Sequence, residues 1–113
     1  MRLSSPSRLE KNMAFKVEVT EAAQESVRAA IEYVRLVFDS PKAAKSLKVE
    51  FDKFLENVAE LPEMYPLMED EALRCIGYRR ALIKAYVAVY TFEDEKITVH
   101  GFFHQLQDYA RFF

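Results

Sequence analysis

The sequence lacks several features that would restrict its class. Cys75 is its single cysteine, so no intramolecular disulfide can form. No apolar run approaches the roughly 18 residues of a membrane-spanning helix, and the N-terminus has no hydrophobic segment of the signal-peptide kind. We therefore expect a cytoplasmic protein with no membrane partner. We expect the isolated thiol of Cys75 to be a small buried hydrophobe.

The sequence also has no excess of positive charge. It carries 16 Lys and Arg against 18 Asp and Glu, a formal net charge of -2. Proteins that bind nucleic acid over a broad surface usually carry an excess of Lys and Arg, so any such contact would have to be local. Acidic residues gather at 56–71 and 93–95. A local basic cluster lies between these segments: Arg74, Arg79, Arg80 and Lys84.

The length of 113 residues suits one domain with a single modest core. Residues 1–13 are polar, Ser-rich and without periodicity. We expect them to form a flexible leader, with Met13 as an alternative start to Met1. Residues 14–113 are then expected to form the single domain.

The first half of this domain predicts one strand and two helices. Residues 15–19 alternate between apolar and polar, which is typical of a strand. Thr20 can cap a following helix, and Ser40 with Pro41 can begin a second one. Each helix has an apolar stripe at spacings of three and four: Ala23, Val27, Ile31 or Ala30, Val34 and Phe38, then Ala44, Leu47, Phe51, Leu55 or Phe54, and Val58. The short break between the helices predicts an antiparallel hairpin.

The second half predicts strands. After a loop at 62–70, residues 73–77 are predicted to form a short strand. Two alternating runs follow, at 83–90 and 97–104, and the acidic turn at 93–95 joins them as an antiparallel hairpin. The expected fold class is therefore α+β, with the order β-α-α-β-β-β and a short C-terminal helix. The helical hairpin should cover one face of a small antiparallel sheet.

Alternation assigns the two faces of this sheet. The aliphatic face is expected to lie against the helices: Ile83, Val87, Ile97 and Val99. The other face is expected to be uncovered and to do the protein's work: Lys84, Tyr86, Tyr90, His100 and His104. Residues four apart on a strand are roughly 13 Å apart, too far for His100 and His104 to share one metal ion. We expect neither a metal nor a cofactor.

Four segments in this order resemble the RelE/ParE superfamily of bacterial toxins, which includes plasmid-stabilisation proteins. The opening strand and helix are FKVEVTEAAQESVRAAIEYV, and the second helix with its leucine-proline exit is SPKAAKSLKVEFDKFLENVAELPEMYP. The paired C-terminal strands are GYRRALIKAYVAVYTF and KITVHGFFHQLQDY. The resemblance implies a type II toxin that is neutralised by a cognate antitoxin protein. It allows a homodimer or a heterotetramer with that antitoxin.

The resemblance leaves the target open. RelE-like members are mRNA interferases that cleave messenger RNA in the ribosomal A site, whereas ParE-like members inhibit DNA gyrase and cut no nucleic acid. A metal-independent nuclease would use His104 as base or acid, Arg79 or Arg80 to hold the phosphate, and Tyr109 to stack on a base. Against this reading, Val87 follows Tyr86 where nuclease members typically carry an arginine.

Each candidate also has a structural alternative. His104 could simply cap a strand end, and Arg79 and Arg80 alternate, so that only one of them reaches the working surface. Further residues are candidates for contacts with a partner or substrate: Arg74, Lys84, Tyr86, Tyr90, His100, Phe112 and Phe113. The sequence therefore leaves three readings: a ribosome-dependent nuclease, a gyrase inhibitor, or a member that only binds its antitoxin.

Overall fold

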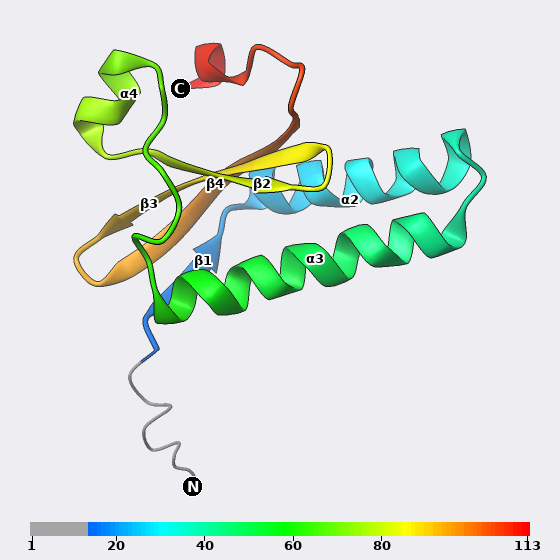
Figure 1. The fold of residues 1–113 in the computed structure, drawn as a ribbon, viewed down its shortest axis with the longest axis horizontal. Coiled ribbons are helices and arrows are strands. Elements are labelled where there is room, and N and C mark those ends of the chain that lie inside the picture. Colours follow the sequence, from blue (N-terminus) through cyan, green and yellow to red (C-terminus); the bar gives the residue numbers. More distant parts are fainter. Residues whose placement is uncertain (1–13) are drawn as a thin grey trace, which may run out of the picture.

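The computed structural model describes residues 14–113, and the expected leader at 1–13 lies outside the described part (Figure 1). The elements in order are β1 (Lys16–Val19), α2 (Glu21–Val37), α3 (Pro41–Glu60), α4 (Glu71–Ile76), β2 (Arg79–Ile83), β3 (Tyr86–Glu93), β4 (Lys96–His104) and the 3-10 helix η1 (Tyr109–Phe112). The helical hairpin of α2 and α3 lies on one side of the sheet, and α4 and η1 lie on the other (Figure 1). The expected α+β class is confirmed.

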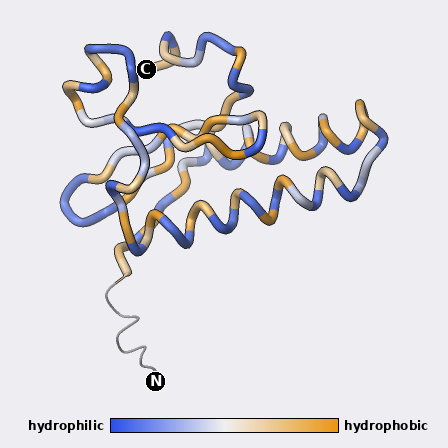
Figure 2. Tube along the Cα trace, in the orientation of Figure 1, coloured by the Kyte–Doolittle hydropathy of each residue, from blue (hydrophilic) through white to orange (hydrophobic). Residues whose placement is uncertain are grey.

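The two long helices begin where their capping residues predict. The Thr20 hydroxyl accepts a hydrogen bond from the Ala23 N–H at 3.1 Å, and the Ser40 hydroxyl accepts one from the Ala43 N–H at the same distance. Apolar residues recur along both helices (Figure 2). Their buried members confirm the predicted stripes: Ala23, Val27 and Ala30 in α2, and Ala44, Leu47, Phe51, Phe54 and Val58 in α3.

The four strands form a mixed sheet in the order β1-β4-β3-β2. The pairs β2–β3 and β3–β4 are antiparallel, whereas β1 runs parallel to β4. The predicted acidic turn between β3 and β4 is confirmed. Asp94 and Glu95 have φ of 53° and 61°, which is the backbone of a two-residue hairpin turn that matches the strand twist.

The strand predicted at 73–77 is wrong, because residues 71–76 form α4. The Asp70 carboxylate accepts a hydrogen bond from the Leu73 N–H at 3.1 Å and so caps the start of this helix. Gly77 ends it with a φ of +105°, a conformation that glycine adopts at little cost. The helix is too short to show a helical period in the sequence. It leaves Cys75 exposed, so the prediction of a buried thiol is also wrong.

The alternating run at 83–90 is interrupted by a turn, although its apolar and polar residues continue to alternate through it. Ile83 pairs with Tyr86 across a two-residue turn in which Lys84 has a φ of +58°. Ile83 and Tyr86 therefore share a face, and the alternation is reset. Tyr86, Ala88 and Tyr90 face the helices, whereas Val87 faces away from them. The expected positions of Val87, Tyr86 and Tyr90 are thus wrong.

A β-bulge in β4 changes the second run. Val89 pairs with Gly101 and Tyr90 pairs with Val99, so His100 is an extra residue between them. Ile97 and Val99 face the helices as expected, but beyond the bulge His104 faces them too, and His100 does not. Gly101 leaves room for the Phe103 ring, because a Cβ at position 101 would lie 2.4 Å from that ring and would require it to shift.

The sheet therefore has two covered faces. The helix face packs against α2 and α3 and carries Ile83, Tyr86, Ala88, Tyr90, Ile97, Val99, Phe102 and His104. The tail face packs against α4 and the C-terminal segment and carries Arg80, Val87, Val89, His100 and Phe103. The expectation that the helices leave Lys84, Tyr86, His100 and His104 together on one uncovered face is wrong.

Candidate functional site

An apolar groove lies between the helical hairpin and the β2–β3 turn. It encloses about 600 Å³. We call it the hairpin groove and define it by its lining residues: Tyr33, Val34, Phe38, Ala43, Leu47, Lys84, Ala85, Tyr86 and His104. Its side chains come from α2, α3, the β2–β3 turn and the ends of β3 and β4, so only the tertiary fold assembles it.

His104 lies at one side of this groove. Its ring is 5.4 Å from the Tyr86 ring in an edge-on arrangement. The Leu106 N–H donates a hydrogen bond to His104 Nδ1 at 3.2 Å. An imidazole nitrogen that accepts a hydrogen bond carries no proton, so the neutral ring has its proton on Nε2. The structural alternative for His104, a strand-end histidine bonded to backbone, describes this bond, and the ring keeps one N–H donor for a ligand.

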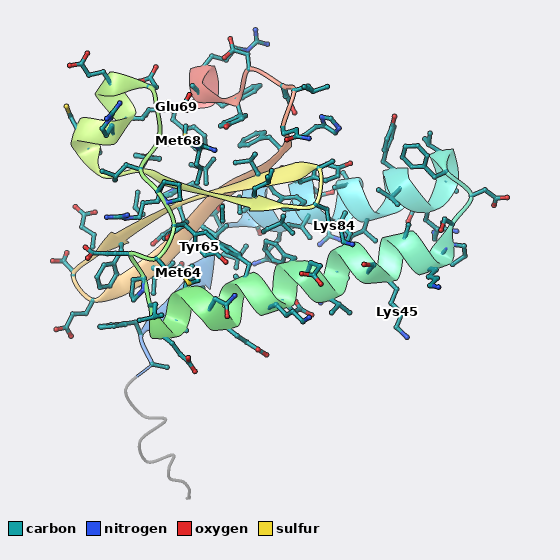
Figure 3. The ribbon with its side chains drawn as sticks, viewed as in Figure 1. Lys45, Met64, Tyr65, Met68, Glu69 and Lys84 are labelled. Atoms are coloured by element: carbon teal, nitrogen blue, oxygen red, sulfur yellow. The ribbon has the colours of Figure 1, made fainter. Side chains whose placement is uncertain are left out.

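Tyr86 and Lys84 complete the polar part of the groove. Tyr86 stacks on Phe102 with ring centroids 5.1 Å apart. Burial raises the pKa of the Tyr86 hydroxyl, and the nearby Tyr33 adds to this. Lys84 is exposed in the β2–β3 turn and lies between that turn and α3 (Figure 3). The groove therefore offers hydrogen-bond donors at its rim and apolar side chains inside.

Arg79 has a structural position. Its guanidinium donates to the Tyr65 carbonyl at 2.7 Å and to the Glu63 carbonyl at 3.4 Å, and it lies 3.9 Å from the Glu63 carboxylate. Its neighbour in the sheet, Tyr90, is fully buried and donates its hydroxyl to the Pro62 carbonyl at 2.7 Å. Both side chains hold the loop at 62–65 against the sheet. Tyr90 is not accessible to a partner.

Arg80 and Tyr109 lie together on the tail face. Both line a polar recess of about 350 Å³ with Met68, Glu69, Asp70, Gln107, Asp108 and Ala110. The Arg80 guanidinium is 3.5 Å from the Glu69 carboxylate. The Tyr109 ring stacks on Phe103 with centroids 5.8 Å apart. An arginine with several carboxylates around it is a weak phosphate ligand, because those carboxylates repel an incoming anion.

His100 is also on the tail face. Its Nε2 lies 2.8 Å from the Thr91 hydroxyl, and its ring is 5.2 Å from that of Tyr78 and 6.4 Å from that of Phe113. Burial lowers the pKa of His100, and the charge of Glu93 partly opposes this. A half-buried imidazole between two aromatic rings is suited to packing.

The remaining candidates lie at the surface. Arg74 is exposed on α4 and donates to the Glu69 carbonyl at 3.3 Å. Phe112 and Phe113 are partly exposed and pack on Phe103. The fold thus divides the candidate nuclease residues between two faces of the sheet: His104 on the helix face, and Arg80 with Tyr109 on the tail face. Arg79 is held by the loop.

Two features are absent from residues 14–113. No group of three or more His, Cys, Asp or Glu side chains in that range is placed to hold a metal ion. In the same range, no helix is both long and apolar enough to cross a membrane.

Comparison with known protein families identifies the family of this chain. The profile of the ParE toxin of type II toxin-antitoxin systems, parDE, matches residues 17–109. The chain belongs to the ParE toxin family. The match spans the domain from β1 to the start of η1, so it includes both the hairpin groove and the tail face of this ParE toxin. No curated protein sequence matches this ParE toxin.

Solved structures agree on the fold of this ParE toxin. The chromosomal ParDE toxin-antitoxin system from P. aeruginosa is similar with a TM-score of 0.63 at 14% identity, over 81% of this chain and 97% of that one. The RelBE2 toxin-antitoxin complex from Mycobacterium tuberculosis is similar with a TM-score of 0.55 at 15% identity, over 80% of this chain and 98% of that one. At these identities the likeness concerns the fold.

Sequence reasoning missed the helical half of the hairpin groove. Tyr33, Val34, Phe38, Ala43 and Leu47 line it. A signal was present, because the apolar stripe of α2 runs on to its last residues. Figure 1 shows that the helical hairpin projects beyond the β2–β3 turn, so the end of that stripe has no sheet to cover it.

Proposed function

We propose that this ParE toxin is the growth-inhibiting component of a toxin-antitoxin module, that a cognate antitoxin neutralises it, and that it inhibits DNA gyrase by binding and without chemistry of its own. Its proposed place of action is the cytoplasm, where gyrase works. Membership of the ParE family supports the toxin role. The two similar solved structures are toxin-antitoxin systems, which supports an antitoxin as partner.

The observation that carries the choice of mechanism is the separation of the candidate nuclease residues. Cleavage of RNA by general acid-base catalysis needs a base, an acid and a cation around one phosphate. His104 lies in the hairpin groove, whereas Arg80 and Tyr109 lie in a recess on the other side of the sheet. The Arg79 guanidinium is occupied by loop carbonyls. These positions favour a binding inhibitor over a nuclease.

The test is induced expression in a bacterium that lacks the antitoxin, with the wild type, His104→Ala and Arg80→Ala. Lys45→Ala is the matched control, because Lys45 extends from the side of α3 away from the sheet (Figure 3). Primer extension on a translated message measures cleavage. A supercoiling assay with purified protein and gyrase measures inhibition, and trapped gyrase–DNA complexes are quantified in cells.

We expect wild-type expression to arrest growth, leave the message intact and inhibit supercoiling. Cuts within codons that disappear in His104→Ala or Arg80→Ala, with unimpaired supercoiling, would move the protein to the nuclease class. Absence of growth arrest with the wild type would leave a chain that only binds its antitoxin.

A further inference from the structure

The side of α2 that faces away from α3 is mostly exposed and carries no charge. Residues of α2 that share a recess with α3 mark the opposite side: Gln24, Arg28 and Ile31. At about 100° per residue, a second set of α2 residues lies roughly half a turn from these: Ala22, Ser26, Ala29, Tyr33, Leu36 and Val37. We call this set the α2 flank. It contains no Asp, Glu, Lys or Arg.

Three large apolar side chains make the α2 flank unusual for a free surface. Tyr33 is 52% exposed, Leu36 63% and Val37 56%. They lie at the end of the helical hairpin that projects beyond the β2–β3 turn (Figure 1), and of the six flank residues only Tyr33 also lines the hairpin groove. A surface helix normally carries polar side chains on the sides that the core does not cover. The α2 flank therefore has the composition of a contact surface.

The side chains of the α2 flank change in size along the helix. Its N-terminal half carries small residues, and its C-terminal half carries large ones. When two copies of α2 run antiparallel, with a two-fold axis next to Ala29, Ala22 lies level with Val37 of the second copy and Ser26 lies level with Tyr33 of the second copy. Large side chains then lie against small ones at both ends, which lets the two helices approach closely. A parallel pairing would instead place large side chains against each other.

The charges beside the α2 flank favour the same arrangement. Within α2, Arg28 pairs with Glu25 and Arg35 pairs with Glu32. In the antiparallel register, Arg35 of the second copy lies one residue, about 1.5 Å along the axis, from the level of Glu25, and Arg28 of the second copy lies as close to the level of Glu32. Each end of the contact therefore gathers two arginines and two glutamates, which balance. A parallel pairing would place each of these charges beside its own copy.

We infer that two copies of this chain associate through their α2 flanks, antiparallel about a two-fold axis next to Ala29. Both copies contribute the same surface, and that surface is complementary to itself in size and in charge. The flank supplies six residues a side, fewer than the roughly 20–30 of a standard interface. We therefore expect a weak dimer, with a Kd on the order of 10 μM. This association does not depend on which target the toxin inhibits.

Sedimentation velocity of the purified full-length chain measures the association, at concentrations from about tenfold below to about tenfold above the expected Kd. Leu36→Glu places a charge on the α2 flank, and Val49→Glu places the same charge at an exposed apolar position of α3. We expect Leu36→Glu to raise the Kd by about tenfold or more, as loss of a central contact does, and Val49→Glu to leave it unchanged. Circular dichroism and urea midpoints compare the folding of both variants. A wild type that stays monomeric, or a Leu36→Glu variant that dimerises like the wild type, would overturn the inference.

Disulfide formation tests the register without weakening the contact. Cys75 is exposed, so every variant also carries Cys75→Ser. Ala29→Cys lies next to the axis and should form a disulfide with its own copy, because a disulfide needs Cα atoms within about 7 Å. Ala22→Cys should not, since its level is about 22 Å from that of Ala22 in the second copy. A mixture of Ala22→Cys and Val37→Cys should form the mixed disulfide. Ala22→Cys dimers that form as readily as Ala29→Cys dimers would contradict the antiparallel pairing.

A charge exchange tests whether the arginines and glutamates meet across the axis. We expect Glu25→Arg to raise the Kd by about twofold to fivefold, as loss of an exposed ion pair does. Arg35→Glu added to the same chain should restore it. Positions 25 and 35 are about 15 Å apart along one helix, so the restoration has to come from the second copy. A double variant that is no tighter than Glu25→Arg alone would show that these charges do not meet and would overturn the proposed register.

Discussion

The two faces of the sheet differ in what covers them. On the helix face, α2 and α3 contribute long apolar stripes, and Phe54, Tyr90, Ile97 and Val99 are fully or almost fully buried there. On the tail face, the short α4 and the C-terminal segment cover a smaller cluster around Met68, Leu73, Val87 and Val89. Much of that cover consists of stacked rings, with Phe103 parallel to both Tyr109 and Phe112.

The two faces therefore differ in the side chains that they contribute to the core and in the polar side chains that they carry. The helix face holds most of the buried aliphatic and aromatic side chains, and Lys84 and His104 lie at its rim, where they border the hairpin groove. The tail face holds Arg80 and His100 beside a thin apolar layer. A sheet with both faces covered has little room for one site that draws on all of these residues.

The strongest test of the comparison is a pair of core truncations. Phe54→Ala removes a ring that packs 5.8 Å from Phe51, 5.6 Å from Tyr65 and 5.7 Å from Tyr90. We expect it to lower the free energy of unfolding by about 3–5 kcal/mol. Met68→Ala on the tail face should cost about 2 kcal/mol, because the loop that carries Met68 can close over the cavity. Urea unfolding followed by circular dichroism measures both. Equal losses would show that the two faces contribute alike.

A second test uses the buried hydroxyl of the helix face. Tyr90→Phe leaves the Pro62 carbonyl without its donor, and we expect a loss of about 1–2 kcal/mol. Tyr109→Phe on the tail face is the control, since it keeps the ring that stacks on Phe103. Unfolding in urea at neutral pH compares the two variants. A similar loss in both would mean that the Tyr90 hydrogen bond is not what fixes the loop.

Because the Tyr90 hydroxyl is buried, we expect the free energy of unfolding to fall at alkaline pH. Burial raises the pKa of Tyr90 from 10.0 to about 12. Above pH 10 the unfolded chain loses this proton while the folded chain keeps it, so stability falls as pH rises through 12, by up to about 3 kcal/mol. Tyr90→Phe should remove that part of the dependence, which urea midpoints between pH 9 and 12 would reveal. An unchanged alkaline slope in Tyr90→Phe would contradict it.

The smallest expected effect is a loss of stability at acidic pH that is due to His100 on the tail face. Burial lowers the pKa of His100 below its ordinary value of 6.5. The unfolded chain therefore takes up this proton first, and the stability due to neutral His100 is present above pH 6.5 and is lost as pH falls through the folded-state pKa. We expect His100→Phe to flatten the decline in urea midpoint between pH 7 and 5. A decline as steep as that of the wild type would assign it to other groups.

Local signals in the sequence were reliable where one residue type fixes one backbone feature. Thr20, Ser40 and Pro41 placed the starts of the two long helices, and their apolar stripes identified the buried faces. The acidic hairpin turn was also found. Asp70 and Gly77 are weaker signals for α4, because that helix is too short to have a visible period in the sequence.

The face assignments failed because alternation continues unchanged across two irregularities. The turn at Lys84 and Ala85 has neither Gly nor Asn, although Lys84 adopts a positive φ. The bulge at His100 inserts one residue beside Gly101. Each event moves the later side chains of its own alternating run to the other face, since the period of a strand is two. His104 and Tyr86 therefore moved towards the helices.

Local features of the sequence predict the ParE toxin fold, its helical hairpin and its C-terminal strand hairpin, because caps, stripes and turns are local consequences of residue type. The grouping of the candidate residues on shared surfaces depends on tertiary packing. Strand register placed His104 in the hairpin groove and Arg80 with Tyr109 behind the sheet. Register depends on how a turn and a bulge are accommodated by packing on both faces, and that is settled when the whole sheet forms.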